Sequence, residues 1–210
     1  MRRVRLSGNQ TTRESVVSPP GVESSKAGNL INALVFFKRQ YDDNVLLEEA
    51  MPEFVRERSS RYRGVRLRDL CREMFTFFRD ADISRLQRAQ FEAAHFPKPV
   101  LVPLDAMQRL VRNTVDYVPI SETAGRIATT LWVVYPPGIA SVIPGERLDA
   151  SAPAIEYLLA FEHAANLFPG FETEIQGLYR ETAPDGKIQF WTYVAQEPQS
   201  FGEARSARTS

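Results

Sequence analysis

The sequence predicts an α+β fold in which a helical first half is followed by a compact mixed domain. Apolar residues recur at helical spacing up to residue 95, and strand-like alternating or apolar runs dominate after residue 113. Two proline-glycine steps, Pro137-Gly138 and Pro144-Gly145, can each supply a type II turn, so the chain bends sharply twice. A chain of 210 residues buries roughly 70% of its unfolded surface, enough for one good core or two small ones.

We divide the chain into four parts. They are a disordered or poorly ordered tail over 1–25, a helical segment over 26–95, a mixed domain over 96–196 and a second disordered tail over 197–210. The arginines, serines and threonines of the first twenty residues faintly resemble a transit peptide. We interpret them as a solvated, disordered start, because one compositional cue does not establish targeting.

The composition is that of a soluble globular protein. Its 26 basic residues balance its 26 acidic ones, whereas a nucleic-acid or anionic-membrane partner requires a basic surplus. No apolar run approaches the roughly 18 residues of a membrane span, and the N-terminus lacks the apolar core of a signal peptide. Cys71 is the single cysteine, so no internal disulfide can form. We therefore expect a cytoplasmic protein with no nucleic-acid and no membrane partner.

Helical spacing of apolar residues predicts two helices at the start of the helical segment. The first covers 26–41 and ends at the polar residues 42–44. The second covers 45–58, where Pro52 fits only at a break or at the start of a new helix.

The clearest helix of the sequence is expected over 66–79, where apolar residues trace one stripe at i, i+3 and i+4. Cys71 lies on this stripe, so we interpret its thiol as a core residue rather than a nucleophile. Asp82 is expected to cap a further helix that runs through Ala94.

Strands are expected to dominate the mixed domain. A short extended stretch over 99–103 leads into a helix with Pro103 in its first turn. The run 114–120 alternates moderately, and 125–135 is apolar on both faces, which is typical of a strand at the centre of a sheet.

The remainder of the mixed domain contains one helix and a hairpin. Ser151 is expected to start a helix over 151–167. A strand is predicted over 171–179, and Asp185-Gly186 is a good turn for a hairpin that returns as a strand over 187–194.

The chain carries little that supports self-sufficient catalysis. It has no glycine-rich phosphate loop, no metal-binding His or Cys spacing and no Gly-x-Ser-x-Gly turn. His95 and His163 are isolated, and we interpret each as a surface or satisfied core residue. Lys26 opens an amphipathic helix without a partner for a cofactor. Glu172 and Glu174 share a strand face that suits a cation or, as we favour, a salt-bridged surface.

The most distinctive stretch is 135–146, which reads Tyr-Pro-Pro-Gly-Ile-Ala-Ser-Val-Ile-Pro-Gly-Glu. It is largely apolar and contains both proline-glycine steps. Glu146 follows the second bend, where backbone amides exposed by the turn could hold its carboxylate.

This stretch belongs to a series of segments that resembles a known family. The segments are 33–42 with its Phe-Lys-Arg-x-Tyr-Asp pattern, the helix with Arg68-Asp69-Leu70, 118–127, 135–146 and 168–177. In this order they resemble the C-terminal portion of the bacterial Orn/Lys/Arg decarboxylases, large fold-type I enzymes that depend on pyridoxal phosphate. The resemblance covers about residues 28–180, and it implies that 26–95 corresponds to the end of the cofactor-binding region.

The sequence departs from the family pattern in two ways. Ala140-Ser141 stand where the family usually has proline and an aliphatic residue, and Val102 stands where a Thr or Ser helix cap is usual. The lost cap costs about 1 kcal/mol and does not prevent the fold. The larger departure is that the Ser-x-His-Lys lysine, the carboxylate for the pyridine nitrogen and the phosphate cup do not occur. The resemblance thus implies pyridoxal phosphate in the complete enzyme and none bound by this chain alone.

The resemblance also implies where this domain works. In the family the C-terminal domain packs by the active-site entrance of the dimer, which makes Tyr135, Glu146, Glu122 and Arg126 candidates for the substrate entrance. Glu146 could meet an amine or guanidinium. The alternative, which we favour, is that Glu146 caps turn amides while Glu122 and Arg126 pair structurally. No catalytic, cofactor-binding or metal-ligating residue is expected in this chain.

Two functions remain open at this point. In the first, the chain is the C-terminal part of a basic amino-acid decarboxylase. It would then form a homo- or hetero-oligomer with a cofactor-domain chain and would be inactive alone. Alternatively, it is a non-catalytic module that binds and modulates a full-length decarboxylase through exposed apolar residues such as Phe36, Phe37 and Leu46. A truncated, functionless remnant is a third possibility, and the sequence does not choose among ornithine, lysine and arginine.

Overall fold

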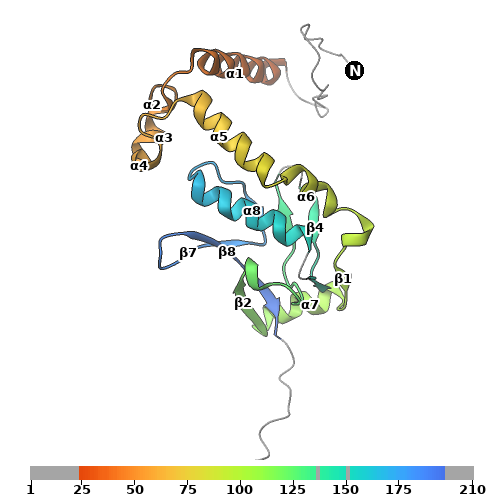
Figure 1. The fold of residues 1–210 in the computed structure, drawn as a ribbon. Helices are drawn as coiled ribbons and strands as arrows, with labels where there is room; N and C mark the ends of the chain where they lie inside the picture. Colours follow the sequence, from red (N-terminus) through yellow and green to blue (C-terminus); the bar gives the residue numbers. More distant parts are fainter. Residues whose placement is uncertain (1–23, 136–137, 150–151, 197–210) are drawn as a thin grey trace, which may run out of the picture.

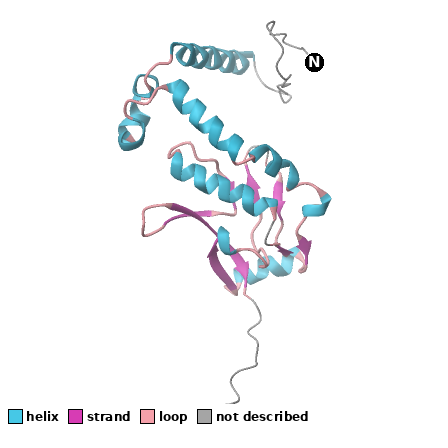
Figure 2. Ribbon diagram, in the orientation of Figure 1, coloured by secondary structure: helices cyan, strands magenta, loops and turns pink. Residues whose placement is uncertain are grey.

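The structure, a computed structural model, shows a helical arm joined to a mixed α+β body (Figures 1 and 2). The arm is residues 24–80, and the body is the described part of residues 81–196. It describes residues 24–135, 138–149 and 152–196. The tails predicted over 1–25 and 197–210 lie outside these residues, except that Ser24 and Ser25 already belong to the first helix. The α+β class is confirmed.

Helices form the arm and cover the sheets of the body (Figure 2). The α-helices are α1 (Ser24–Asp43), α2 (Leu47–Ala50), α3 (Pro52–Glu57), α4 (Ser59–Tyr62), α5 (Leu67–Asp80), α6 (Ile83–Ala89), α7 (Pro103–Val111) and α8 (Pro153–Leu167), with 3-10 helices η1 (Ala93–His95) and η2 (Ile120–Glu122). The strands are β1 (Lys98–Pro99), β2 (Val115–Pro119), β3 (Trp132–Val134), β4 (Ala140–Val142), β5 (Glu146–Arg147), β6 (Ile175–Gln176), β7 (Tyr179–Thr182) and β8 (Ile188–Ala195).

The helices with strong local periodicity are confirmed. The helix predicted over 26–41 is α1, and the one over 66–79 is α5. The segment 45–58 breaks as expected, because Pro52 occupies the first turn of α3 and ends α2 before it.

The helix predicted over 82–94 is wrong in its extent. It ends at Ala89, and a single 3-10 turn follows near His95. Asp82 precedes the helix, but its side chain makes no cap hydrogen bond because the residue adopts a left-handed conformation with φ 51°. Its carboxylate instead accepts a hydrogen bond from Nε of Arg85 at 2.6 Å.

All strand pairs are antiparallel and form small sheets in the orders β2-β8-β7, β4-β3-β6 and β1-β5. The strands predicted over 114–120 and 187–194 are confirmed as β2 and β8. The hairpin turn is also confirmed, since Gly186 has φ 83° and Oδ1 of Asp185 accepts a hydrogen bond from the backbone N–H of Lys187.

The two longest predicted strands are broken. Only Trp132–Val134 of 125–135 is regular, although β3 does lie at the centre of its sheet. The chain leaves one sheet for another at Thr129, whose hydroxyl donates to Tyr193 O at 2.8 Å. The strand over 171–179 is interrupted at Gly177, where φ is 85°.

Two hydrophobic cores meet at α8. The larger core surrounds Trp132 in the body, and the smaller one lies between α2, α4, α5 and the C-terminal end of α8, where Phe168 is buried. Phe168 packs edge-on against Phe77 of α5 at a centroid distance of 5.7 Å. Cys71 packs at the smaller core, as predicted, and burial raises the pKa of its thiol. Helix α8 and the residues directly after it therefore pack the arm on the body, where Phe171 contacts Phe54 and Tyr62.

Two side chains of α8 take the place of a missing strand beside β8. Strand β2 pairs with β8 only from Trp191 onward, so the edge of the first half of β8 needs other partners. Asn166 donates to Ile188 O and accepts from Ile188 N, both at 2.8 Å, and Glu162 accepts from Phe190 N at 2.6 Å. This i, i+4 pair fixes α8 on the sheet.

Replacing Glu162 tests this arrangement. Burial raises the pKa of Glu162, so the folded state holds the proton more tightly than the unfolded state does. Its stabilising contribution is thus largest below the ordinary pKa of 4.5 and is lost as the pH rises through the raised value. Glu162→Gln should remove this pH dependence and keep an oxygen acceptor, whereas Glu162→Ala should cost about 1–3 kcal/mol by leaving the Phe190 amide unpaired.

The measurement is urea unfolding at several pH values. Glu156→Gln is the matched control, because Glu156 lies exposed on the same helix. Equal pH profiles for wild type and Glu162→Gln would contradict the assignment.

Candidate functional site

The distinctive stretch leads from β3 through β4 to β5. Pro136 and Pro137 lie outside the described residues, so only Gly138 of the first predicted turn is seen, with the positive φ of 78° that the turn requires. The second turn is confirmed. Gly145 has φ 95°, and the backbone N–H of Glu146 donates to Ile143 O at 3.2 Å.

Glu146 bonds Ile143 across the turn through both its backbone and its side chain. Besides the backbone bond, its Oε2 accepts a hydrogen bond from the backbone N–H of Ile143 at 2.8 Å. The predicted capping of turn amides is therefore confirmed. Burial raises the pKa of Glu146, and the Ile143 amide partly offsets this by favouring the carboxylate.

The turn is held between two other segments of chain. Gly145 O accepts from the N–H groups of Val100 and Leu101 at 2.9 and 3.0 Å, and Gly145 N donates to Ala128 O at 2.8 Å. Ala128 N in turn donates to Glu146 O at 2.9 Å. No local sequence pattern indicates these contacts, because they join segments far apart along the chain.

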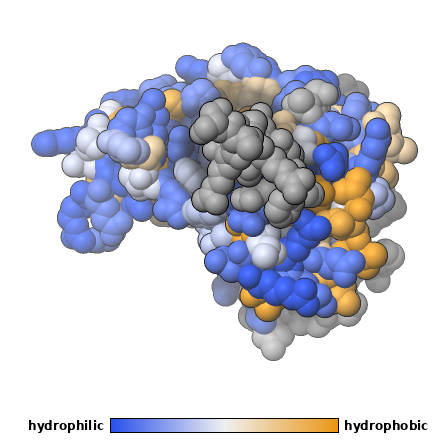
Figure 3. Space-filling view, turned by 90° about the horizontal axis from the view of Figure 1, so that it is seen from below, coloured by the Kyte–Doolittle hydropathy of each residue, from blue (hydrophilic) through white to orange (hydrophobic). Residues whose placement is uncertain are grey.

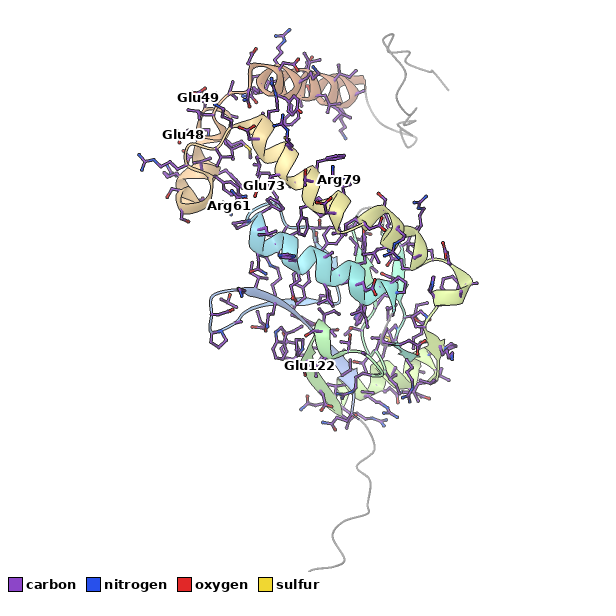
Figure 4. All side chains as sticks on the ribbon, viewed as in Figure 1. Glu48, Glu49, Arg61, Glu73, Arg79 and Glu122 are labelled. Atoms are coloured by element: carbon purple, nitrogen blue, oxygen red, sulfur yellow. The ribbon has the colours of Figure 1, made fainter. Side chains whose placement is uncertain are left out.

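Arg126 does not form the predicted pair with Glu122. Its guanidinium pairs with Asp116 of β2 and also donates to Ala195 O at 3.3 Å. Glu122 lies exposed on η2, in the body, well away from the labelled acidic residues of the arm (Figure 4). The prediction is wrong because β2 and β8 bring Asp116 to the arginine, and sequence spacing carries no trace of that tertiary pairing.

Tyr135 is the most exposed of the candidates on the stretch itself, with 56% of its surface accessible. Its backbone N–H donates to Glu174 O at 3.2 Å at the end of β3. Its ring lies over Gly138, where an added Cβ would come within 2.9 Å of the Tyr135 Cζ. The glycine thus provides the space in which this ring sits.

The structure brings only two of the four candidates, Arg126 and Glu146, onto neighbouring segments, and it does so through the backbone. Arg126 and Glu146 lie on paired segments, and Tyr135 lies at the other end of the stretch from Glu146. The charged groups of Arg126 and Glu146 have separate partners, so among the described residues these candidates form no shared catalytic group. Among the described residues no helix combines the length and apolar character needed to cross a membrane.

The remaining charged and titratable candidates have structural partners. Glu172 accepts from Gly170 N at 2.9 Å and from Arg180 at 3.0 Å, which confirms the salt bridge for Glu172, although it and the exposed Glu174 precede β6 instead of sharing a strand face. Although burial alone would raise the pKa of Glu172, these two donors hold it below its ordinary value. His163 packs edge-on against Phe77 at 5.2 Å.

The described residues do not fit pyridoxal phosphate, whose binding requires a lysine in an enclosed site. Lys38 and Lys187 are exposed and paired with Asp42 and Asp185, and the other two lysines of the chain, Lys26 and Lys98, are exposed at the surface. None can form a Schiff base with a cofactor held by these residues.

Comparison with known proteins assigns the family. Residues 84–196 match the sequence model described as Orn/Lys/Arg decarboxylase, C-terminal domain. The chain is 35% identical over 175 residues to the ornithine decarboxylase of Haemophilus influenzae and 37% identical over 175 residues to the constitutive ornithine decarboxylase of Escherichia coli. Each match covers 83% of this chain and 24% of the relative. The chain thus spans about a quarter of the length of these curated relatives.

Solved structures agree with the sequence matches. Lysine decarboxylase A from Pseudomonas aeruginosa superposes with a TM-score of 0.74 at 33% identity, over 84% of this chain and 23% of that one. The E. coli constitutive lysine decarboxylase gives a TM-score of 0.71 at 28% identity, over 84% of this chain and 24% of that one. On its sequence, its fold and its Tyr135 to Glu146 stretch, this chain belongs to the Orn/Lys/Arg decarboxylase family, of which it carries the C-terminal domain.

Proposed function

We propose that this chain is the C-terminal part of a pyridoxal-phosphate-dependent decarboxylase of ornithine, lysine or arginine, acting in the cytoplasm with a cofactor-binding part that its described residues do not supply. The observation that carries the proposal is the match to about a quarter of ornithine and lysine decarboxylases, combined with lysines that do not fit the cofactor. Decarboxylation of an amino acid needs the cofactor ring as an electron sink, so the chain alone is inactive.

In this function the Tyr135 to Glu146 stretch is one wall of the substrate entrance. The accessible ring of Tyr135 offers a face to a cationic side chain, and the exposed carboxylate of Glu122 offers a charge. Glu146 and Arg126 have a structural role at this entrance and do not bind substrate. The Glu146 carboxylate already accepts from Ile143 N, and the Arg126 guanidinium already pairs with Asp116.

Co-expression tests the proposal. The partner is the constitutive ornithine decarboxylase of E. coli cut before the part that matches this chain. We expect the two chains to co-purify and to release an amine from ornithine, lysine or arginine, while each chain alone releases none. A partner whose cofactor-binding lysine is replaced by alanine is the matched control and should co-purify without activity. Amine release by this chain alone, or failure to co-purify, would sink the proposal.

A second function is a regulatory module that binds a full-length decarboxylase. The exposed rings of Phe36 and Phe37 favour it, whereas Leu46 is half-buried and does not contribute an exposed apolar surface. Titration of the purified chain into full-length E. coli ornithine decarboxylase should then change its activity. Unchanged activity at saturating concentration excludes this role.

A further inference from the structure

A groove lies between the second half of α8 and the turn that joins β7 to β8, on elements that pack side by side in the body (Figure 1). Its volume is about 640 Å³, and it is lined by Glu162, His163, Asn166, Leu167 and residues 185–189. The lining carries two carboxylates, Glu162 and Asp185, against the single ammonium group of Lys187. None of these residues belongs to the Tyr135 to Glu146 stretch, so the groove is separate from the proposed substrate entrance.

Glu162 has a free acceptor in this groove. Its Oε2 accepts a hydrogen bond from Phe190 N at 2.6 Å, whereas its Oε1 makes no hydrogen bond within the described residues. Burial raises the pKa of Glu162, the Phe190 amide offsets this in part, and no charged group of the described chain offsets the rest. The carboxylate therefore lacks a cation that would stabilise its ionised form.

The neighbouring side chains do not supply that cation. Asn166 uses both ends of its amide, since Nδ2 donates to Glu162 O and Ile188 O and Oδ1 accepts from Ile188 N. The Lys187 ammonium group pairs with Asp185 at 3.1 Å. The negative charge of Glu162 thus stays available to a ligand from outside the chain.

These features suit an organic ammonium ion. An ammonium group brings several N–H donors for Glu162 Oε1 and a charge that matches the lining, while Leu167 and Ile188 offer apolar surface to an alkyl chain. A metal ion suits the groove less, because the described residues contain no group of three or more His, Cys, Asp or Glu side chains placed to hold one. An anion would meet the excess of negative charge.

We propose that the groove binds a short alkylammonium ion, whose ammonium group donates to Glu162 Oε1 and whose chain lies against Leu167 and Ile188. The bound ion joins α8 to the turn between β7 and β8. Loss of carbon dioxide from ornithine or lysine leaves such an ion, butane-1,4-diamine or pentane-1,5-diamine in protonated form. This source rests on the proposed function, whereas the site itself does not.

An exposed apolar surface on α7 lies at the other end of β8. Helix α7 exposes Leu104, Met107 and Val111. The chain after it leads into Val115, which pairs with Ala195 at the end of β8 opposite the groove. Figure 3 shows apolar residues gathered on one side of the body when it is seen from below, the side on which α7 lies in Figure 1. The groove, with its charged lining, is not an extension of this surface.

Titration of the full chain with butane-1,4-diamine tests the proposal. The readout is the chemical shift of backbone amides, measured by NMR at about pH 7, where carboxylates are ionised and primary amines are protonated. The Phe190 and Lys187 amides should shift most, because Phe190 N bonds Glu162 and Lys187 lines the groove. We expect a Kd of about 1 mM, within the range that a ligand of this size reaches.

Glu162→Gln should raise this Kd about tenfold or more, because glutamine keeps an acceptor for Phe190 N but loses the negative charge. Glu156→Gln is the matched control. Glu156 lies exposed on α8 and does not line the groove, so this variant should bind as wild type does. Unchanged binding by Glu162→Gln, or equal weakening by both variants, would overturn the site.

Lys187→Gln gives a result that misfolding cannot imitate. It removes a positive charge from the lining and frees the Asp185 carboxylate, so the diamine should bind roughly threefold to tenfold more tightly. The hydrogen bond from Lys187 N to Asp185 uses the backbone and is kept, which preserves the turn. An unchanged or higher Kd for this variant would contradict the site.

Control probes separate the cation from the alkyl chain and from salt. Butan-1-ol, and sodium chloride at the same ionic strength, should leave the amide shifts unchanged. If either reproduces the shifts, or if butane-1,4-diamine causes none up to about 100 mM, a hundred times the expected Kd, the inference fails. The proposed function would stand, because co-expression tests it separately. Conversely, a chain that binds the diamine but yields no activity on co-expression keeps the site and loses only the proposed source of its ligand.

Discussion

Replacing Gly145 by alanine is expected to destabilise the fold by about 2–4 kcal/mol. Gly145 has φ 95°, a conformation that costs an L-residue roughly 1–2 kcal/mol. The added Cβ would also lie 2.3 Å from Leu101 O and 3.0 Å from Leu101 C. These are backbone atoms, so the chain before α7 must move and weaken the hydrogen bonds that Val100 and Leu101 donate to Gly145 O, at about 1 kcal/mol each.

Gly125→Ala separates the two causes. Gly125 also has a positive φ of 78°, but no atom lies within 4 Å of the position an added Cβ would take. This variant should therefore show only the conformational cost of roughly 1–2 kcal/mol. Urea unfolding of both variants measures the difference. If Gly145→Ala were no less stable than Gly125→Ala, Leu101 would not be fixed against the turn as the structure has it.

The elements that the sequence predicted well are those whose signals are local. The stripe over 66–79 needs only the spacing of apolar residues along one helix, and Pro52 ends α2 through its own ring geometry. The turn before Glu146 likewise follows from a proline and a glycine in adjacent positions. Its carboxylate could be placed because its acceptor role depends on an amide only three residues away.

The elements that were predicted wrongly depend on distant parts of the chain. The partner of Arg126 is Asp116, which reaches it only after β2 has paired with β8. The apolar run over 125–135 predicts one strand, yet two adjacent threonines inside it, Thr129 and Thr130, direct their hydroxyls to other segments. Those threonines were the available signal. The hydrogen bonds of Glu162 and Asn166 to β8 have no local signal in the sequence. They depend on β2 ending beside Trp191, which leaves the first half of this β8 edge without a strand partner.

Trp132→Ala is expected to cost about 3–5 kcal/mol, because it removes a fully buried indole from the centre of the larger core. Trp191 is the matched control. It is the other tryptophan of the chain and lies half-buried on the aromatic face with Tyr117, at a centroid distance of 5.1 Å. Its replacement by alanine should cost clearly less. Urea unfolding followed by circular dichroism measures both, and equal losses would contradict a core centred on Trp132.

Trp132→Phe separates the loss of volume from the loss of the indole N–H. Nε1 lies 3.2 Å from the hydroxyls of both Thr130 and Thr192, which are themselves 2.9 Å apart. The Thr192 hydroxyl also donates to Gly177 O at 3.0 Å. The two hydroxyls therefore keep partners when the indole N–H is lost, and phenylalanine should recover most of the stability that alanine loses, leaving a deficit of about 1–2 kcal/mol. A Phe variant as unstable as the Ala variant would instead show that the indole N–H holds these two threonines, and with them the junction between β3 and β8.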